Sequence, residues 1–211
     1  MSTHLPGLLP RPTIAVFDIG KVLLDWDPRH LYRKMFDDED RMERFIADVC
    51  TMDWILEFDR GAPFTDAIPA RIAQFPRYEA EIRAFDERWL ETLAGVIPGS
   101  IALLRTLQAQ GVPNYAITNY SAEKFEASRP HYPFLDSFDG IVVSGREKLL
   151  KPDAAIYHLF LDRFGLKAED CLFIDDSLKN VEGARAVGMH AHHFTGAEGL
   201  HSELKRHGFP V

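Results

Sequence analysis

The chain has 211 residues, of which 46% are hydrophobic, 11% aromatic and 27% charged. This length suits one compact domain, or one core with a modest insertion, and the composition excludes disordered and fibrous proteins. The formal net charge is −8, and the sequence contains no run of basic residues. Because nucleic acids and anionic membranes attract clusters of Lys and Arg, neither is expected as the main partner.

The N-terminal segment MSTHLPGLLPRPT contains three prolines and no long apolar stretch. It resembles neither a signal peptide nor a membrane anchor, so we expect a cytoplasmic protein. Next, the apolar residues 14–17 end at Asp18, which predicts a buried parallel strand with a carboxylate at its carboxyl end. A second apolar patch at 22–24 predicts a tight turn or a small flap.

From residue 28 to about residue 93 the apolar residues recur three and four apart, which predicts helices and no strand. After Ile97-Pro98-Gly99 the two patterns alternate. The predicted helices are 100–110, 122–128, 153–164 and 178–187, and the predicted strands are 112–118, 138–143, 171–174 and 189–194. This alternation predicts right-handed parallel crossovers and therefore an α/β fold, a doubly wound parallel sheet of the Rossmann-like type. We expect residues 28–95 to form an inserted all-helical cap domain on a core of residues 1–27 and 96–211.

Polar side chains follow the predicted strands, at the edge where an open α/β sheet binds its ligands. They are Asp18 and Gly20, Thr118 and Asn119, Ser144 and Gly145 with Lys151-Pro152, and Asp175-Asp176-Ser177. Mg²⁺ prefers oxygen ligands and usually takes one or two protein carboxylates beside a substrate phosphate. A lysine ammonium can neutralise that phosphate next to a carboxylate nucleophile. The set therefore predicts a Mg²⁺ site and a small anionic substrate.

The same residues resemble the four motifs of the haloacid dehalogenase (HAD) superfamily. The stretches FDIGKVLLDWDP, ITN, KPDAAIY and FIDDSLKNVEGARAVG occur in the family's order, and the resemblance extends over essentially the whole chain. Within the superfamily they are most similar to bacterial sugar-phosphate phosphatases of the glucose-1-phosphate phosphatase type. The family also places a helical cap directly after its first motif, where this chain carries its helical block.

The resemblance implies a magnesium-dependent phosphatase in which Asp18 attacks phosphorus and is transiently phosphorylated. It implies Mg²⁺ ligands on Asp18, the Gly20 carbonyl and Asp176, with Asp175 outside the direct ligands or as an alternative ligand. The implied phosphoryl-binding residues are Thr118, Asn119 and Lys151, and the last of these also stabilises the nucleophile. The expected substrates are small phosphorylated metabolites, with sugar phosphates among them, and the expected assembly is a monomer or a small homo-oligomer.

One position departs from the family pattern. Most HAD phosphatases carry a second aspartate two residues after the nucleophile, as general acid, and this chain has Gly20 there. Asp25 and Asp27 are the candidates to replace it, and Lys21 is interpreted as a solvated or supporting residue. In the cap, the residues considered for substrate choice are Arg29, Arg60, Glu87 and Trp89, while Trp26 and Trp54 are expected to pack the cap against the core.

Three rival functions remain open. A two-component receiver domain combines similar residues, but its acidic pair follows the first strand rather than a late one. A haloacid dehalogenase proper uses the same Asp nucleophile without metal, and the pair Asp175-Asp176 argues against it because a metal-free site has no use for extra negative charge. The third is a catalytically weak binding protein, which the glycine at position 20 suggests.

Overall fold

The computed structural model describes residues 11–211, so most of the N-terminal segment lies outside the described residues. Its centre is a parallel sheet of five strands in the order β5-β4-β1-β6-β7. The strands are β1 (Ile14–Phe17), β4 (Asn114–Thr118), β5 (Gly140–Val143), β6 (Cys171–Asp175) and β7 (His190–His193). The predicted doubly wound α/β fold is confirmed.

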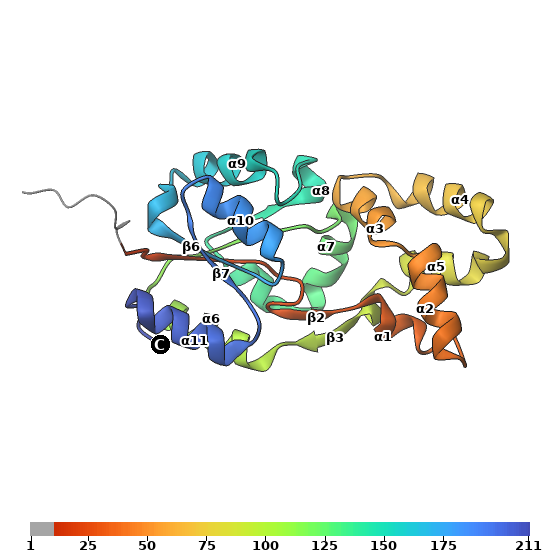
Figure 1. Cartoon of the computed structure of the whole chain (residues 1–211), viewed down its shortest axis with the longest axis horizontal. Coiled ribbons are helices and arrows are strands. Elements are labelled where there is room, and N and C mark those ends of the chain that lie inside the picture. Colours follow the sequence, from red (N-terminus) through yellow and green to blue (C-terminus); the bar gives the residue numbers. More distant parts are fainter. Residues whose placement is uncertain (1–10) are drawn as a thin grey trace, which may run out of the picture.

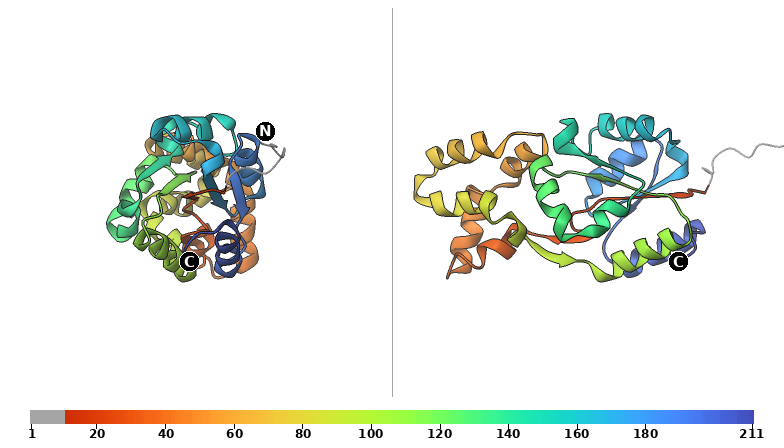
Figure 2. Two further views of the ribbon diagram at one scale, coloured as in Figure 1. Left: turned by 90° about the vertical axis from the view of Figure 1, so that its left-hand side faces the viewer. Right: turned by 180° about the vertical axis from the view of Figure 1, so that it is seen from behind.

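Helices cover both faces of this sheet (Figure 1). One face carries α6 (Pro98–Ala109) and α11 (Ala197–His207), and the other carries α9 (Ala154–Phe164) and α10 (Leu178–Ala186). Viewed along the strands in Figure 2, the sheet lies between these two helical layers. The short helices α7 (Ala122–Ser128) and α8 (Ser144–Glu147) follow β4 and β5.

The alternation of side chains along β1 explains the two layers. Ile14 and Val16 pack in the cluster with α9 and α10, whereas Ala15 and Phe17 pack in the cluster with α6 and α11. Successive side chains of a strand point to opposite faces, so an unbroken apolar strand must be covered on both sides. The sheet is thereby buried, and only its strand ends are left to meet a ligand.

A group of five helices follows β2 (Leu24–Trp26) and extends from the end of the sheet toward which β1 runs (Figures 1 and 2). They are α1 (Pro28–Tyr32), α2 (Glu39–Asp48), α3 (Met52–Asp59), α4 (Phe64–Gln74) and α5 (Glu79–Glu87). Aromatic rings hold them together, with Phe58 stacked on Phe64 at a centroid distance of 3.9 Å. We call these helices the cap; the domain bounds 28–95 stay a prediction.

Three features of the chain differ from the sequence prediction. Residues Leu93–Val96 form β3, which pairs antiparallel with β2, although no strand was predicted up to about residue 93. The partner strand lies some seventy positions earlier in the chain, so no local pattern announces the pair. Helices α8 and α11 were also missed, and most predicted strand bounds shift by one or two residues. The 3-10 turns are Pro76–Tyr78, Trp89–Thr92, Arg129–His131, Pro133–Ser137 and Ala168–Asp170.

Within residues 11–211, no helix combines the length and the apolar character that crossing a membrane requires.

Candidate active site

Asp18 lies directly after the central strand β1, at the carboxyl end of the sheet. Its backbone N–H donates to the Ile174 carbonyl at 2.8 Å, and its Oδ1 accepts a hydrogen bond from the Ile19 N–H at 2.7 Å. The residue is 8% exposed. Because β1 is hydrogen-bonded to strands on both sides, its end is held firmly and the carboxylate keeps one direction.

The ammonium group of Lys151 is buried between two carboxylates. Its Nζ lies 2.8 Å from Asp18 Oδ1 and 2.7 Å from Asp175 Oδ2, and the side chain is 0% exposed. It also donates to the Ile117 carbonyl at 3.0 Å. Burial lowers the pKa of Lys151, but the charges of Asp175 and Asp18 outweigh this, and the net pKa is raised. The group is therefore a fixed cation.

Two residues at the carboxyl end of β4, Thr118 and Asn119, belong to this arrangement. Asn119 Oδ1 accepts from the Lys151 N–H at 2.9 Å, and Asn119 Nδ2 donates to the Lys151 carbonyl at 3.1 Å. These reciprocal bonds fix the loop that carries the ammonium. The Thr118 hydroxyl is buried and has no hydrogen-bond partner within the described chain. Such a group is available to bind a ligand.

The two acidic residues at the end of β6, Asp175 and Asp176, differ in their burial and in their hydrogen bonds. Asp175 is 0% exposed, and its oxygens accept from the Ser177 N–H at 2.8 Å and from Asn180 Nδ2 at 3.0 and 3.1 Å. Together with the Lys151 contact, these bonds occupy both of its oxygens. Asp176 is half-buried and lines the pocket described below. Burial, and then the charge of Asp175, raise the pKa of Asp176.

The three carboxylates form the one cluster in residues 11–211 that could hold a metal ion: Asp18, Asp175 and Asp176 each offer an oxygen, all within 4.8 Å of one another. This all-oxygen donor set fits the ligand preference of Mg²⁺. Burial raises the pKa of Asp18 to about 7, while Lys151 opposes the rise and Asp175 adds to it. A cation beside these groups favours their ionised forms.

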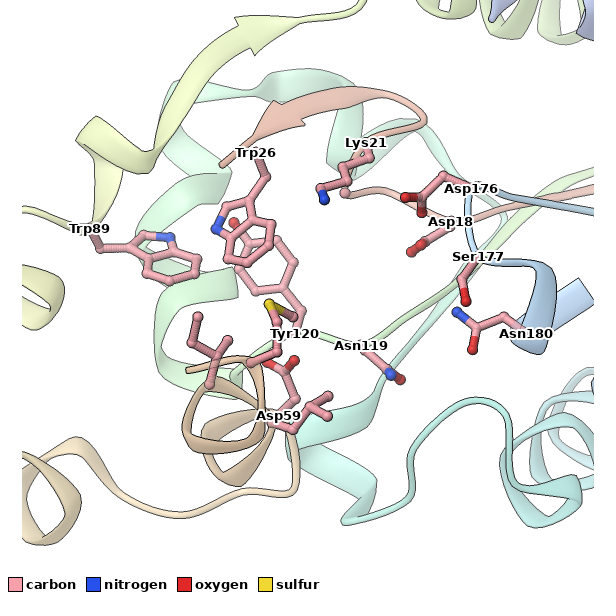
Figure 3. Close-up of a pocket in the computed structure, with 14 residues that line it drawn as sticks. Asp18, Lys21, Trp26, Asp59, Trp89, Asn119, Tyr120, Asp176, Ser177 and Asn180 are labelled. Carbon is pink, nitrogen blue, oxygen red and sulfur yellow. The ribbon is translucent and has the colours of Figure 1, made fainter. Parts of the chain in front are cut away.

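A pocket opens at the strand ends, between the sheet and the cap (Figure 3). Its polar side consists of Asp18, Gly20, Lys21, Asn119, Asp176, Ser177 and Asn180. Its opposite side is largely apolar and consists of Trp26, Met52, Ile55, Leu56, Trp89 and Tyr120, with Asp59 among them. The pocket therefore joins an anion-binding and metal-binding end to an apolar end.

The structure brings most of the predicted site residues together. The pocket is lined by Asp18, Gly20, Asn119 and Asp176. Lys151 does not line it but contacts Asp18 through its ammonium group. Lys151 and three others of the set, Thr118, Asp175 and Ser144, are fully or almost fully buried and are not lining residues.

Of the four cap residues considered for substrate choice, Trp89 alone lines the pocket. Arg29 instead binds Glu43 through two hydrogen bonds of 2.6 and 2.7 Å. Trp26 lines the pocket as well, whereas Trp54 is buried within the cap against Phe58 and Phe85.

Asp25 and Asp27, the candidates for the general acid that is absent at Gly20, do not lie at the pocket. Asp25 has a side chain 54% exposed and contacts His30 at 3.2 Å. Asp27 caps α1, accepting from the Arg29 N–H at 2.8 Å. Neither lines the pocket. Lys21 does, and its charge lowers the pKa of Asp176, so it supports the site.

Sequence reasoning missed Asp59, the last residue of α3. It is 9% exposed and lines the pocket from the cap side. Burial raises the pKa of Asp59 to about 7, against the charges of Lys151 and Arg60 and a backbone hydrogen bond from Ser121. The sequence did not mark it, because α3 carries two further acids, Asp53 and Glu57, and the structure alone shows that these two are exposed.

The sheet, the cap and the strand-end carboxylates define a doubly wound α/β protein with a site suited to a metal ion and an anionic ligand. The model of the haloacid dehalogenase-like hydrolases matches residues 13–188, and the chain belongs to this family. The recognised HAD resemblance and the prediction of an enzyme are thereby confirmed.

Relatives and solved structures agree with this assignment. The chain is 31% identical over 195 residues to a sesquiterpene phosphatase of Aspergillus oryzae, which covers 91% of this chain and 94% of that protein. It is 30% identical over 125 residues to a phosphoglycolate phosphatase of Rhodospirillum rubrum, covering 58% of this chain and 48% of that enzyme. A HAD family enzyme of Bacteroides thetaiotaomicron, in complex with magnesium and inorganic phosphate, has a similar fold, with a TM-score of 0.69 at 18% identity over 88% of this chain and 95% of that one.

Proposed function

We propose that this chain is a magnesium-dependent phosphatase that hydrolyses small phosphomonoesters through an aspartyl-phosphate on Asp18. The observation that carries the proposal is the contact of the fully buried ammonium of Lys151 with Asp18, which lines the same pocket as Asp176. A carboxylate beside a fixed cation can approach a phosphate dianion that it would otherwise repel. The phosphatase names of the relatives support the same reaction.

Each residue then has a definite task. The bonds from Ile19 and Lys151 fall on Asp18 Oδ1, so Oδ2 is the oxygen that attacks phosphorus. The Thr118 hydroxyl, which lacks a partner in the described structure, donates to a phosphoryl oxygen, and Lys151 neutralises the charge that develops there.

The metal would be held by Asp18, Asp176 and the carbonyl of Gly20, all of which line the pocket. When bound, Mg²⁺ supplies charge neutralisation to the phosphoryl oxygens. Asp175 fixes Lys151 and leaves direct coordination to its neighbour, because its two oxygens already accept hydrogen bonds.

The test is hydrolysis of p-nitrophenyl phosphate by the wild type, with Mg²⁺ and with excess EDTA. We expect activity with Mg²⁺, loss of activity with EDTA, and loss in Asp18→Asn, while Asp53→Asn on the exposed side of α3 serves as control. With ³²P-labelled substrate, a denaturing quench should leave label on the wild type that hydroxylamine releases. Metal-independent chloride release from 2-chloropropionate, without phosphate release, would instead favour the dehalogenase alternative.

We also propose that the preferred substrate carries an apolar group on its phosphate. The side of the pocket that faces the metal-binding end offers mostly rings and aliphatic chains, including Trp26, Ile55 and Trp89. Met52 lies on the same side with 53% of its surface exposed, which leaves apolar area for a ligand to cover. A hydrocarbon gains about 0.8 kcal/mol for each buried CH₂ group, whereas a sugar there loses hydrogen bonds to water. The likeness to a sesquiterpene phosphatase supports this preference over sugar phosphates.

A series of ethyl, butyl and octyl phosphate, with glucose 1-phosphate for comparison, tests the preference. We expect kcat/KM to rise with chain length, by up to about fourfold per CH₂. Met52→Asn should flatten the rise, whereas Val96→Asn should not, because Val96 is an exposed apolar residue (41%) outside the pocket lining. A flat series combined with efficient hydrolysis of glucose 1-phosphate would favour sugar phosphates.

A further inference from the structure

Most HAD phosphatases carry an aspartate two residues after the nucleophile, which gives a proton to the leaving group. This chain has Gly20 at that position, and a glycine side chain cannot donate a proton. The alcohol of an alkyl ester is a poor leaving group, so its oxygen needs a proton as the bond to phosphorus breaks. Among the described residues, the carboxylates that line the pocket are those of Asp18, Asp59 and Asp176. Asp18 is the proposed nucleophile and Asp176 a proposed metal ligand. Asp59 is the remaining carboxylate, and the proposed mechanism does not yet use it.

We propose that Asp59 is the general acid of this site, an inference that rests on the proposed phosphatase function. Figure 3 shows Asp59 on α3, across the pocket from Asp18. In an in-line displacement the leaving oxygen lies opposite the attacking one, on the cap side of the phosphorus. An acid that acts on this oxygen must therefore come from the wall that faces Asp18, and Asp59 is the carboxylate of that wall.

The environment of Asp59 favours its protonated form near neutral pH. Burial raises the pKa of Asp59 to about 7. The charged groups that act on it are Lys151 and Arg60, which lower this pKa, and its own charge raises the pKa of the neighbouring Tyr120. An acid whose pKa lies near the working pH is the most effective donor, because it is protonated before the reaction and releases its proton readily.

Asp18 Oδ2 forms a bond to phosphorus while the bond from phosphorus to the ester oxygen breaks, and Asp59 gives its proton to that oxygen, so a neutral alcohol leaves. Asp59 is then a carboxylate. It takes a proton from the water that attacks the aspartyl-phosphate, which releases inorganic phosphate and restores both aspartates.

Leaving-group dependence distinguishes a proton donor from a residue that only binds substrate. We expect Asp59→Asn to lower kcat for octyl phosphate by about 10²–10⁴-fold and to lower kcat for p-nitrophenyl phosphate far less, because p-nitrophenolate leaves without a proton. The wild-type kcat/KM for the alkyl ester should fall as the pH rises above about 7. This decline should disappear in Asp59→Asn.

Two further variants keep the test decisive. Asp59→Glu should retain much of the alkyl phosphatase activity, which shows that the fold survives a change at this position. A Cβ at Gly20 would meet nothing within 4 Å, so the backbone leaves room for a side chain to begin there, and Gly20→Asp should restore alkyl phosphate hydrolysis to Asp59→Asn. Equal losses on both esters, or a change in KM alone, would overturn the role of Asp59. Absence of p-nitrophenyl phosphatase activity in the wild type would refute the phosphatase proposal itself.

Discussion

The buried carboxyl group of Asp59 should make the stability of this protein fall between pH 5 and pH 8. Folding raises the pKa of Asp59 from 3.8 to about 7, so in this interval the folded chain holds a proton that the unfolded chain has released. Stability therefore decreases as the pH rises and levels off once the pH has passed about 7. From pH 5 to pH 7 the change is about two pH units at 1.36 kcal/mol each, or at most about 2.7 kcal/mol.

Asparagine has nearly the same shape and cannot titrate, so Asp59→Asn removes this contribution. Relative to the wild type, the variant should gain at most about 2.7 kcal/mol of unfolding free energy at pH 8 compared with pH 5. Urea unfolding at both pH values, followed by tryptophan fluorescence, measures the difference. Asp53→Asn places the same change on the exposed side of α3 and should follow the wild type. If Asp59→Asn differs from the wild type by the same amount at both pH values, the buried carboxyl is not protonated in the folded state and our reasoning is wrong.

Three other substitutions test the support of the site, and a fourth serves as a control. Lys151→Met should abolish p-nitrophenyl phosphatase activity and cost about 3–5 kcal/mol in urea unfolding at pH 8, with a smaller cost at pH 5, where the carboxylates left without a cation can be protonated. Asn119→Ala should lower kcat and cost about 1–3 kcal/mol, because it removes both bonds to the Lys151 backbone. Gly183→Ala should cost about 1–3 kcal/mol, since its Cβ would lie 2.6 Å from the Pro152 carbonyl oxygen, whereas Gly199→Ala, with a nearest contact of 3.8 Å, should be neutral or stabilising. Thermal unfolding of the two glycine variants decides that comparison, and equal melting temperatures would contradict it.

Much of this site follows from the sequence because it is built on strand ends. A buried strand is a run of apolar residues, and the polar residue that ends the run is visible without any structure. Once parallel strands are predicted, their carboxyl ends must lie at one edge, and Asp18 and Asp176 fall in one pocket as a consequence. Lys151 was grouped with these residues because it comes after the strand at 138–143, and the resemblance to the HAD motifs added its expected role in stabilising Asp18.

Tertiary packing decided the cap side of the pocket. Asp59, Asp53 and Glu57 are three acids on one helix, and only the way α3 packs against the end of the sheet buries the first and exposes the others. Trp26 and Trp89 also line the pocket, whereas Arg29 is hydrogen-bonded to Glu43, and the sequence distinguished none of these outcomes. The end of a buried strand coincides with the end of an apolar run that the local sequence shows, whereas the side that a helix turns toward a pocket depends on contacts with residues far away in the chain.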